Sequence, residues 1–316
     1  MKVYIVSDLE GVACVFSRRE GYINAMEYGT MELAAMCESM LAAGVTDILI
    51  NCFHIMQYHM FPKQVRFFHS EPTPDFFTPC MEEGFDAVMI TGMHAMSGGA
   101  DKGNWRHTLL PPPISRAYSS IEEMRIGGKP VGETALIAMF AGLHNVPVVF
   151  FSGEHWACKE AKDLIPGIIT VETKKGKSFY SAVSRHPQAV AEESADKAVE
   201  ALKNIGEIKP VIIDSPVKLE VTYTFEARAA DAIKAIKNAV RIDERTVAVT
   251  YKDLSELKSS FGCMRAPEDD LHQRDLGLER VTGFITRTGK EPYFPGSTYP
   301  YTEQIDFALT GWGNKE

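Results

Sequence analysis

Residues 1–11, MKVYIVSDLEG, place two acids directly after a short β-branched run. The run Val3–Ser7 predicts a buried strand, and side chains alternate along an extended chain, so Asp8 and Glu10 would point the same way. A solvated turn or a helix cap would also explain two acids here. Against that, adjacent carboxylates repel each other unless a cation lies between them. The stretch therefore predicts a core strand whose end carries a candidate metal site.

Further apolar runs follow along the chain and alternate with segments of helical spacing. The predicted strands are Asp47–Asn51 (DILIN), Ala87–Thr91 (AVMIT) and Val146–Phe151, and the predicted helices lie near residues 33–41, 74–83 and 133–144. A hairpin is expected around Gly127 and Gly128. Alternating strands and helices are typical of an α/β fold, so we expect a mostly parallel, layered sheet with helices on both faces over residues 1–185.

Residues 186–265 predict a smaller α+β domain. It would contain helices over 187–205, 226–238 and 253–265, an alternating strand Leu219–Phe225 and a strand Thr246–Tyr251. Residues 266–316 are rich in Gly, Pro and Tyr, which predicts an extended C-terminal tail.

Charge and cysteine usage exclude several classes of protein. The chain has 316 residues with 33 Lys and Arg against 42 Asp and Glu, a net charge of −9, which argues against nucleic acid or an anionic membrane as partner. No apolar run is long enough to span a bilayer, and an acid at position 8 comes too early for a signal peptide. The six cysteines include no CxxC pair, which favours free thiols. We therefore expect a cytoplasmic protein.

Chemistry-bearing side chains follow the other predicted strands. His54 comes after the second strand, His94 after the third, and Glu133 opens the next predicted helix. Each has an ordinary structural explanation, since Glu is favoured in a first helical turn and a lone His often serves packing. However, ligands of α/β sheets bind beyond the carboxyl ends of the strands, where these residues would join Asp8 and Glu10.

The residue types favour a particular ion. Two imidazoles with three carboxylates suit zinc better than Mg²⁺ or Ca²⁺, which prefer shells of oxygen. Two zinc ions, three carboxylates and one bridging hydroxide would be neutral, and Asp8 is the candidate to bridge the ions. His107 follows in the loop after His94. Beside such a site it would carry a proton, and otherwise it would be an ordinary surface histidine. Glu154 and His155 would orient ligands, unless the residues around Ser152 simply cap a helix.

Five motifs carry a resemblance to a known family. Ser7-Asp8-Leu9-Glu10-Gly11, Asn51-x-x-His54, Gly92-Met93-His94-Ala95, Gly103-x-x-x-His107 and Pro130-Val131-Gly132-Glu133 occur in this order. Over residues 1–265 the chain resembles the bacterial zinc D-aminopeptidases that are encoded with dipeptide transporters. Two motifs depart from the usual pattern, at Cys52-Phe53 and at Gly153-Glu154-His155, so the substrate specificity is not carried over.

The resemblance implies a dinuclear zinc site held by Asp8, Glu10, His54, His94 and Glu133. It also implies a ring-shaped homo-oligomer that releases N-terminal D-residues from short peptides. His107 would be the catalytic residue, as a nucleophile or, with a zinc-activated hydroxide attacking, as a proton shuttle.

Two other functions compete with the peptidase. A strand followed by Asp-x-Glu-Gly is similar to the start of the Mg²⁺-dependent aspartyl-phosphate phosphohydrolases, although His54 and His94 would then have no role. A non-catalytic, oligomeric binding protein with a decayed site is the third hypothesis, although every candidate position keeps a metal-ligand residue type.

Overall fold

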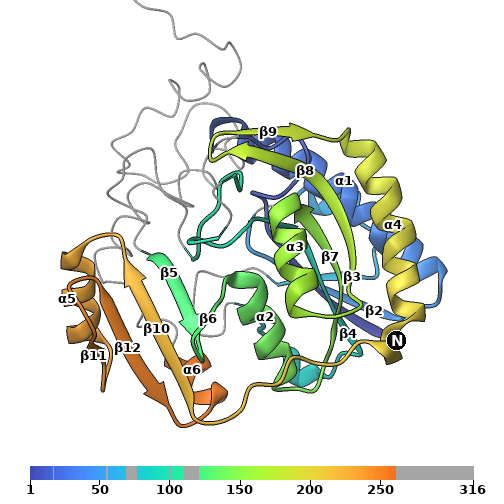
Figure 1. The fold of residues 1–316 in the computed structure, drawn as a ribbon. Coiled ribbons are helices and arrows are strands. Elements are labelled where there is room, and N and C mark those ends of the chain that lie inside the picture. The colour runs from blue at the N-terminus through green and yellow to red at the C-terminus, as the bar shows by residue number, and fades with distance from the viewer. Residues whose placement is uncertain (17, 55, 69–76, 100–101, 110–120, 261–316) are drawn as a thin grey trace, which may run out of the picture.

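A computed structural model describes residues 1–16, 18–54, 56–68, 77–99, 102–109 and 121–260, and in it the chain forms two sheets (Figure 1). The larger sheet has seven strands in the order β3-β2-β1-β4-β7-β8-β9. These strands are β1 (Lys2–Ser7), β2 (Asp47–Cys52), β3 (Val65–Phe68), β4 (Ala87–Met93), β7 (Val148–Glu154), β8 (Ile169–Ser178) and β9 (Ser181–Ser184). All neighbours pair in parallel except β8 and β9.

The strand order of the larger sheet reverses direction between β1 and β4. From β1 the chain moves outward to β2 and β3, and from β4 it moves the other way to β7 and β8. Both central strands are fully buried along most of their length, as expected for a parallel sheet covered on both faces. A reversal of this kind leaves a crevice at the carboxyl ends of the two strands, where α/β proteins bind their ligands.

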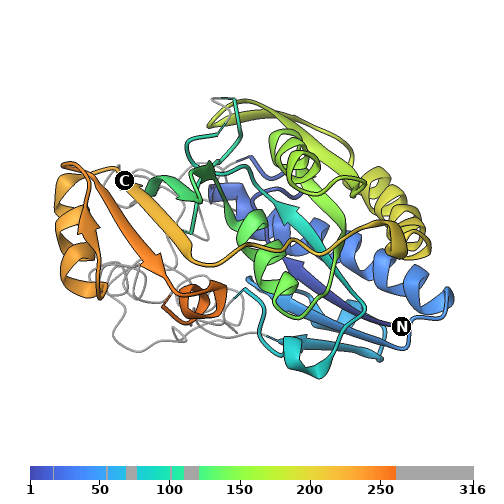
Figure 2. The ribbon, with the colours of Figure 1, turned by 60° about the horizontal axis from the view of Figure 1, so that its bottom comes forward.

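Helices cover the larger sheet in two pairs. α1 (Arg18–Ala42) packs along α4 (Pro187–Lys203), while α2 (Glu133–Gly142) contacts α3 (His155–Leu164), as the two views show (Figures 1 and 2). α2 is buried along its whole length, because it lies between the two sheets and also contacts α6 (Leu254–Ser260). The predicted layered α/β fold with helices on both faces is therefore confirmed.

The second sheet has five strands in the order β11-β12-β10-β5-β6, all antiparallel. They are β5 (Ile121–Ile126), β6 (Lys129–Pro130), β10 (Val217–Tyr223), β11 (Val240–Arg241) and β12 (Thr246–Tyr251), with α5 (Glu226–Ala235) packed against them. The predicted hairpin is thus present as β5–β6, but it joins the second sheet through β10. The boundary at residue 185 remains a prediction.

The helix predicted over residues 74–83 is wrong for the residues that the structure describes there. Within the predicted helix 74–83, the described residues form only a short 3₁₀ helix, Met81–Glu83, because Pro79 breaks the pattern and Cys80 adopts a left-handed φ of 63°. Two more such turns are Tyr58–Met60 and Ile205–Glu207. The tail 266–316 and Cys263 lie outside the described residues, and the five described cysteines are free.

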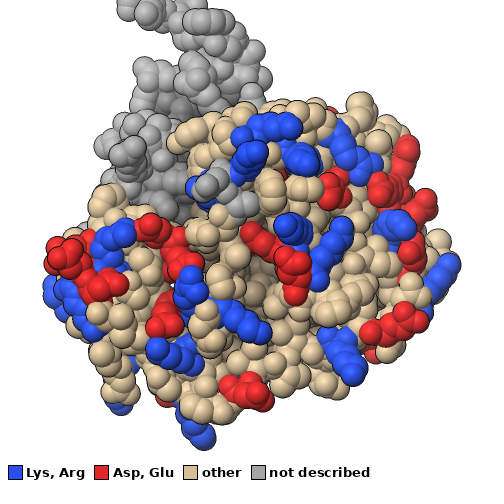
Figure 3. All heavy atoms as spheres, in the orientation of Figure 1, with Lys and Arg blue, Asp and Glu red and all other residues tan. Residues whose placement is uncertain are grey.

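The surface carries both signs of charge. On the face shown in Figure 3, acidic and basic side chains are interspersed. Among the described helices, none combines the length and the apolar character that crossing a membrane requires.

Candidate metal centre

The carboxyl-end edge of the larger sheet gathers the five predicted metal ligands and the predicted catalytic histidine. Asp8 and Glu10 follow β1, His54 follows β2 and His94 follows β4, while Glu133 is the first residue of α2. His107 joins them from the loop after β4. Except for His54, whose side chain is 20% exposed, all are buried. The topology explains the gathering, since β1 and β4 are the strands at which the sheet order reverses.

Asp8 lies between the two strand-end histidines. Its Oδ1 is 3.2 Å from His54 Nε2, and its Oδ2 is 3.4 Å from His94 Nε2. Two groups of possible ligand atoms share it, one with Glu10 and His54 and one with His94 and Glu133, and within each group the atoms lie within 4.8 Å of one another. A carboxylate that presents one oxygen to each of two donor groups is suited to bridge two ions.

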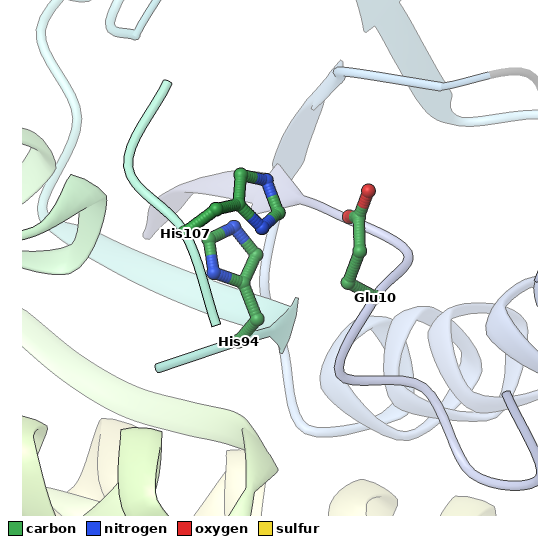
Figure 4. A group of neighbouring side chains, drawn as sticks. All are labelled: Glu10, His94 and His107. Carbon is green, nitrogen blue, oxygen red and sulfur yellow. The ribbon is translucent and has the colours of Figure 1, made fainter. Parts of the chain in front are cut away.

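Backbone carbonyls orient two of the imidazole rings. His94 Nδ1 lies 2.9 Å from the Ala95 carbonyl and His107 Nδ1 lies 2.7 Å from the Trp105 carbonyl. A carbonyl only accepts hydrogen bonds, so both Nδ1 atoms carry hydrogen, and each neutral ring keeps its lone pair on Nε2. The two rings stack with centroids 3.6 Å apart, and Glu10 lies across from them (Figure 4). Glu10, His94 and His107 form a third group of possible ligand atoms.

Several buried atoms of the site have no hydrogen-bond partner among the described residues. They are Asp8 Oδ2, Glu10 Oε2 and His94 Nε2. A buried polar atom without a partner costs about 1–3 kcal/mol, more when it is charged. Three such atoms in one place fit a cation that would bind to them. The combination of imidazole nitrogens and carboxylate oxygens fits zinc, so the residues present are compatible with it.

The electrostatics of the site also favour a cation. Burial raises the pKa of Asp8 to about 6 and raises the pKa of Glu10. Burial would lower the pKa of His94, but Glu133, Asp8 and Glu10 together raise it to about 10. Burial and the neighbouring charge on His94 lower the pKa of His107 to about 4. Without a metal, a proton on His94 thus offsets part of the charge of three buried carboxylates.

Glycines allow the ligand loops to meet. Gly11 donates its N–H to the Gly92 carbonyl at 2.6 Å, and Asp8 donates to the Thr91 carbonyl at 2.9 Å. A Cβ on Gly92, whose φ is +65°, would lie 2.2 Å from the Asp8 carbonyl oxygen. The close backbone contact between the β1 and β4 loops therefore requires glycine, and it brings Asp8 and His94 together.

Glu154 has a structural role. It is fully buried, caps α3 by accepting the Trp156 N–H at 2.8 Å, and accepts the Gly176 N–H at 2.7 Å. The alternative that Ser152 caps the helix is wrong, because the chain remains in β7 through Glu154, and Glu154 is the cap. His155 Nδ1 lies 2.9 Å from Glu172 Oε2. A role of Glu154 and His155 in orienting ligands stays a prediction.

Two buried residues near the site escaped the sequence reasoning. Lys174 in β8 and Asn104 in the loop before His107 are 2% and 0% exposed. Lys174 stands in Lys-Lys-Gly-Lys, which is typical of a solvated loop, and no pattern in the sequence marks it as buried.

Comparisons with known proteins identify the family of this chain. Residues 1–263 match the family described as D-aminopeptidase. A D-aminopeptidase from Bacillus subtilis (strain 168) is 23% identical over 266 residues, covering 81% of this chain and 93% of the relative. Among solved structures, the Zn-dependent D-aminopeptidase DppA from Bacillus subtilis, described as a self-compartmentalizing protease, superposes with a TM-score of 0.76 at 21% identity, covering 84% of this chain and 96% of that one. Because the family match spans most of its length, this chain belongs to the D-aminopeptidase family.

Proposed function

We propose that the protein is a zinc-dependent aminopeptidase that releases N-terminal D-residues from short peptides, with two zinc ions per subunit. The family and the Zn-dependent relative support the activity and the metal. The observation that carries the proposal is the position of Asp8, with one carboxylate oxygen toward His54 and the other toward His94. That arrangement favours a site for two ions over a site for one.

The ligand sets follow from the groups around Asp8. Asp8, Glu10 and His54 would hold one ion, and Asp8, His94 and Glu133 the other. Zinc bound there would polarise the scissile carbonyl and acidify water. The Leu109 N–H donates to Glu133 Oε1 at 2.7 Å, which orients this carboxylate toward His94.

His107 is suited to move a proton. Its Nδ1–H is committed to the Trp105 carbonyl, so a neutral ring has its lone pair on Nε2. A neutral imidazole accepts a proton and passes it on, as hydrolysis of a peptide requires. We therefore assign His107 the role of proton shuttle rather than nucleophile.

Assembly and location complete the proposal. The structural relative is described as self-compartmentalizing, which supports a proposal that this chain forms a homo-oligomer. We propose that this oligomer is ring-shaped and that the protein is cytoplasmic. Light scattering tests the assembly, because a ring would have a mass several times 35.1 kDa.

Metal analysis and a paired substrate test examine the activity. The purified protein is expected to contain about two zinc ions per chain, to hydrolyse D-Ala-D-Ala faster than L-Ala-L-Ala, and to lose and regain activity on chelation and zinc addition. Asp8→Asn should lower the zinc content and activity, while Asp163→Asn, on the exposed surface of α3, should change neither. Hydrolysis that persists in metal-free protein would contradict the proposal.

The Mg²⁺ phosphohydrolase is not favoured. Its metal would need a shell of oxygen ligands, whereas His54 and His94 both present Nε2 to Asp8. A decayed binding site is not favoured either, because all three carboxylates and both strand-end imidazoles are still in place and lie in groups within ligand distance of one another.

A further inference from the structure

Lys174 is a lysine inside the protein, next to the metal-ligand loop. It lies in β8 and is 2% exposed. Lysine is almost never fully buried unless its amine is paired. Its neighbour on the same strand, Lys175, is exposed, so the burial is specific to position 174. A buried amine at this cost needs a reason in the structure around it.

The Lys174 amine bonds to the loop that carries Asp8 and Glu10. Its Nζ donates to the carbonyl oxygens of Glu10 and Val15. The preceding residue, Thr173, donates its hydroxyl to the Gly11 carbonyl. Two adjacent residues of β8 thus bind three carbonyls of one short loop. Because the Glu10 carbonyl belongs to a proposed ligand, its position sets where the Glu10 side chain begins.

The contact does not depend on the charge of the amine. Burial lowers the pKa of Lys174 to about 7, while the carboxylates of Glu154 and Glu10 act in the opposite direction. An amine has at least two N–H donors in either protonation state, enough for both carbonyls.

The same strand also supports the loop that carries His107. A Cβ on Gly176 would lie 2.6 Å from the Asn104 nitrogen, so β8 directly abuts this loop. Asn104 donates to the Phe179 carbonyl at 3.0 Å and to the Phe16 carbonyl at 3.3 Å. β8 is therefore a common support for two loops that enter the site from β1 and β4.

We propose that Lys174 is a positioning residue for the metal centre, which fixes the Glu10 carboxylate by holding the Glu10 and Val15 carbonyls. It contacts no ligand atom and would act through Glu10. This proposal rests on the proposed zinc site. The role of Lys174 differs from general stabilisation of the fold, because loss of Lys174 is expected to change the zinc affinity only when Glu10 is present.

Zinc affinity measured by competition with a chelating dye tests the proposal. Lys174→Met keeps an unbranched apolar side chain, one atom shorter, but removes the N–H donors. It should weaken zinc binding about 10- to 100-fold, as loss of a residue that supports a ligand does. Lys175→Met, the exposed neighbour, should leave the affinity unchanged. In a Glu10→Gln background, Lys174→Met should have little further effect, since coupled residues are not additive.

Thr173→Val decides the matter if Lys174→Met does not fold. It is close to isosteric, removes only the donor to Gly11, and should weaken zinc binding to a lesser degree. Folded variants at both positions with the zinc affinity of the original protein would overturn the proposal, as would full additivity with Glu10→Gln. If the unaltered protein binds zinc but hydrolyses no D-dipeptide, the proposed activity fails while the role of Lys174 is still measured.

Discussion

His107 provides the sharpest residue-scale prediction, because one of its ring nitrogens is committed to the backbone and the other faces the site. His107→Ala should lower kcat by about 100- to 10,000-fold, the usual contribution of a positioned proton carrier. The zinc content should stay unchanged, because the proposed ligand sets do not include it. Steady-state kinetics and metal analysis on the same sample measure both.

The matched control is His59→Ala, at an exposed position in the turn Tyr58–Met60, which should leave both quantities unchanged. Loss of one zinc ion in His107→Ala would instead make His107 a ligand with Glu10 and His94.

At this scale, the sequence predicted the positions of the strand-end residues well. Asp8, His54 and His94 each follow an apolar run, and the ends of parallel strands meet at one edge. Lys174 was beyond prediction, because its burial depends on carbonyls that come from a loop some 160 positions earlier in the chain. The alternative of a cap at Ser152 was wrong, because β7 extends past Ser152 before the helix starts.

The contact between the β1 and β4 loops gives a prediction at the scale of elements. Gly92→Ala should destabilise the protein by more than about 2 kcal/mol, since it combines a left-handed φ with a Cβ 2.2 Å from the Asp8 carbonyl. It should also weaken zinc binding, because the Asp8 and His94 loops would move apart. Urea unfolding and dye competition measure the two effects.

Gly84→Ala is the matched control for this substitution. Its φ is also positive, at +75°, but nothing lies within 4 Å of a Cβ there. It should cost only the conformational strain, about 1–2 kcal/mol, and leave zinc binding intact. Equal effects of the two substitutions would show that the loop contact adds nothing.

Elements with a clear apolar or alternating pattern were predicted, whereas the strands β8 and β9, which lack one, were not. β4 and β7 are buried along their whole length, and β1 and β2 are buried except at their first residue, which the sequence marks clearly. β8 carries Glu172 and three lysines, so its pattern resembles a loop, and β9 is a short edge strand. The β5–β6 hairpin was predicted as a local feature. Its place in the second sheet was not predicted, because the hairpin pairs with β10, which lies about 90 residues further along the chain.

At the scale of the whole molecule, the metal centre joins segments that are far apart in the chain. Its proposed ligands come from the loops after β1, β2 and β4 and from the start of α2, which lies between the two sheets. An ion that binds this folded arrangement but not the unfolded chain stabilises the fold by mass action, by about 4 kcal/mol at a thousand times its Kd. Chelation should therefore lower Tm by several degrees.

The stabilisation by zinc should depend on pH in a defined direction. In the metal-free protein the pKa of His94 is about 10, so near neutrality zinc must displace a proton from this ring, and binding releases it. Lower pH favours the proton, so the rise in Tm on adding zinc should be larger at pH 8 than at pH 6. Scanning calorimetry at pH 6 and at pH 8 measures this rise. In the Asp8→Asn variant, the rise in Tm on adding zinc should be much smaller at both pH values. An equal rise in Tm at both values would mean that zinc binds without displacing the His94 proton, and the proposed ligand set would be wrong.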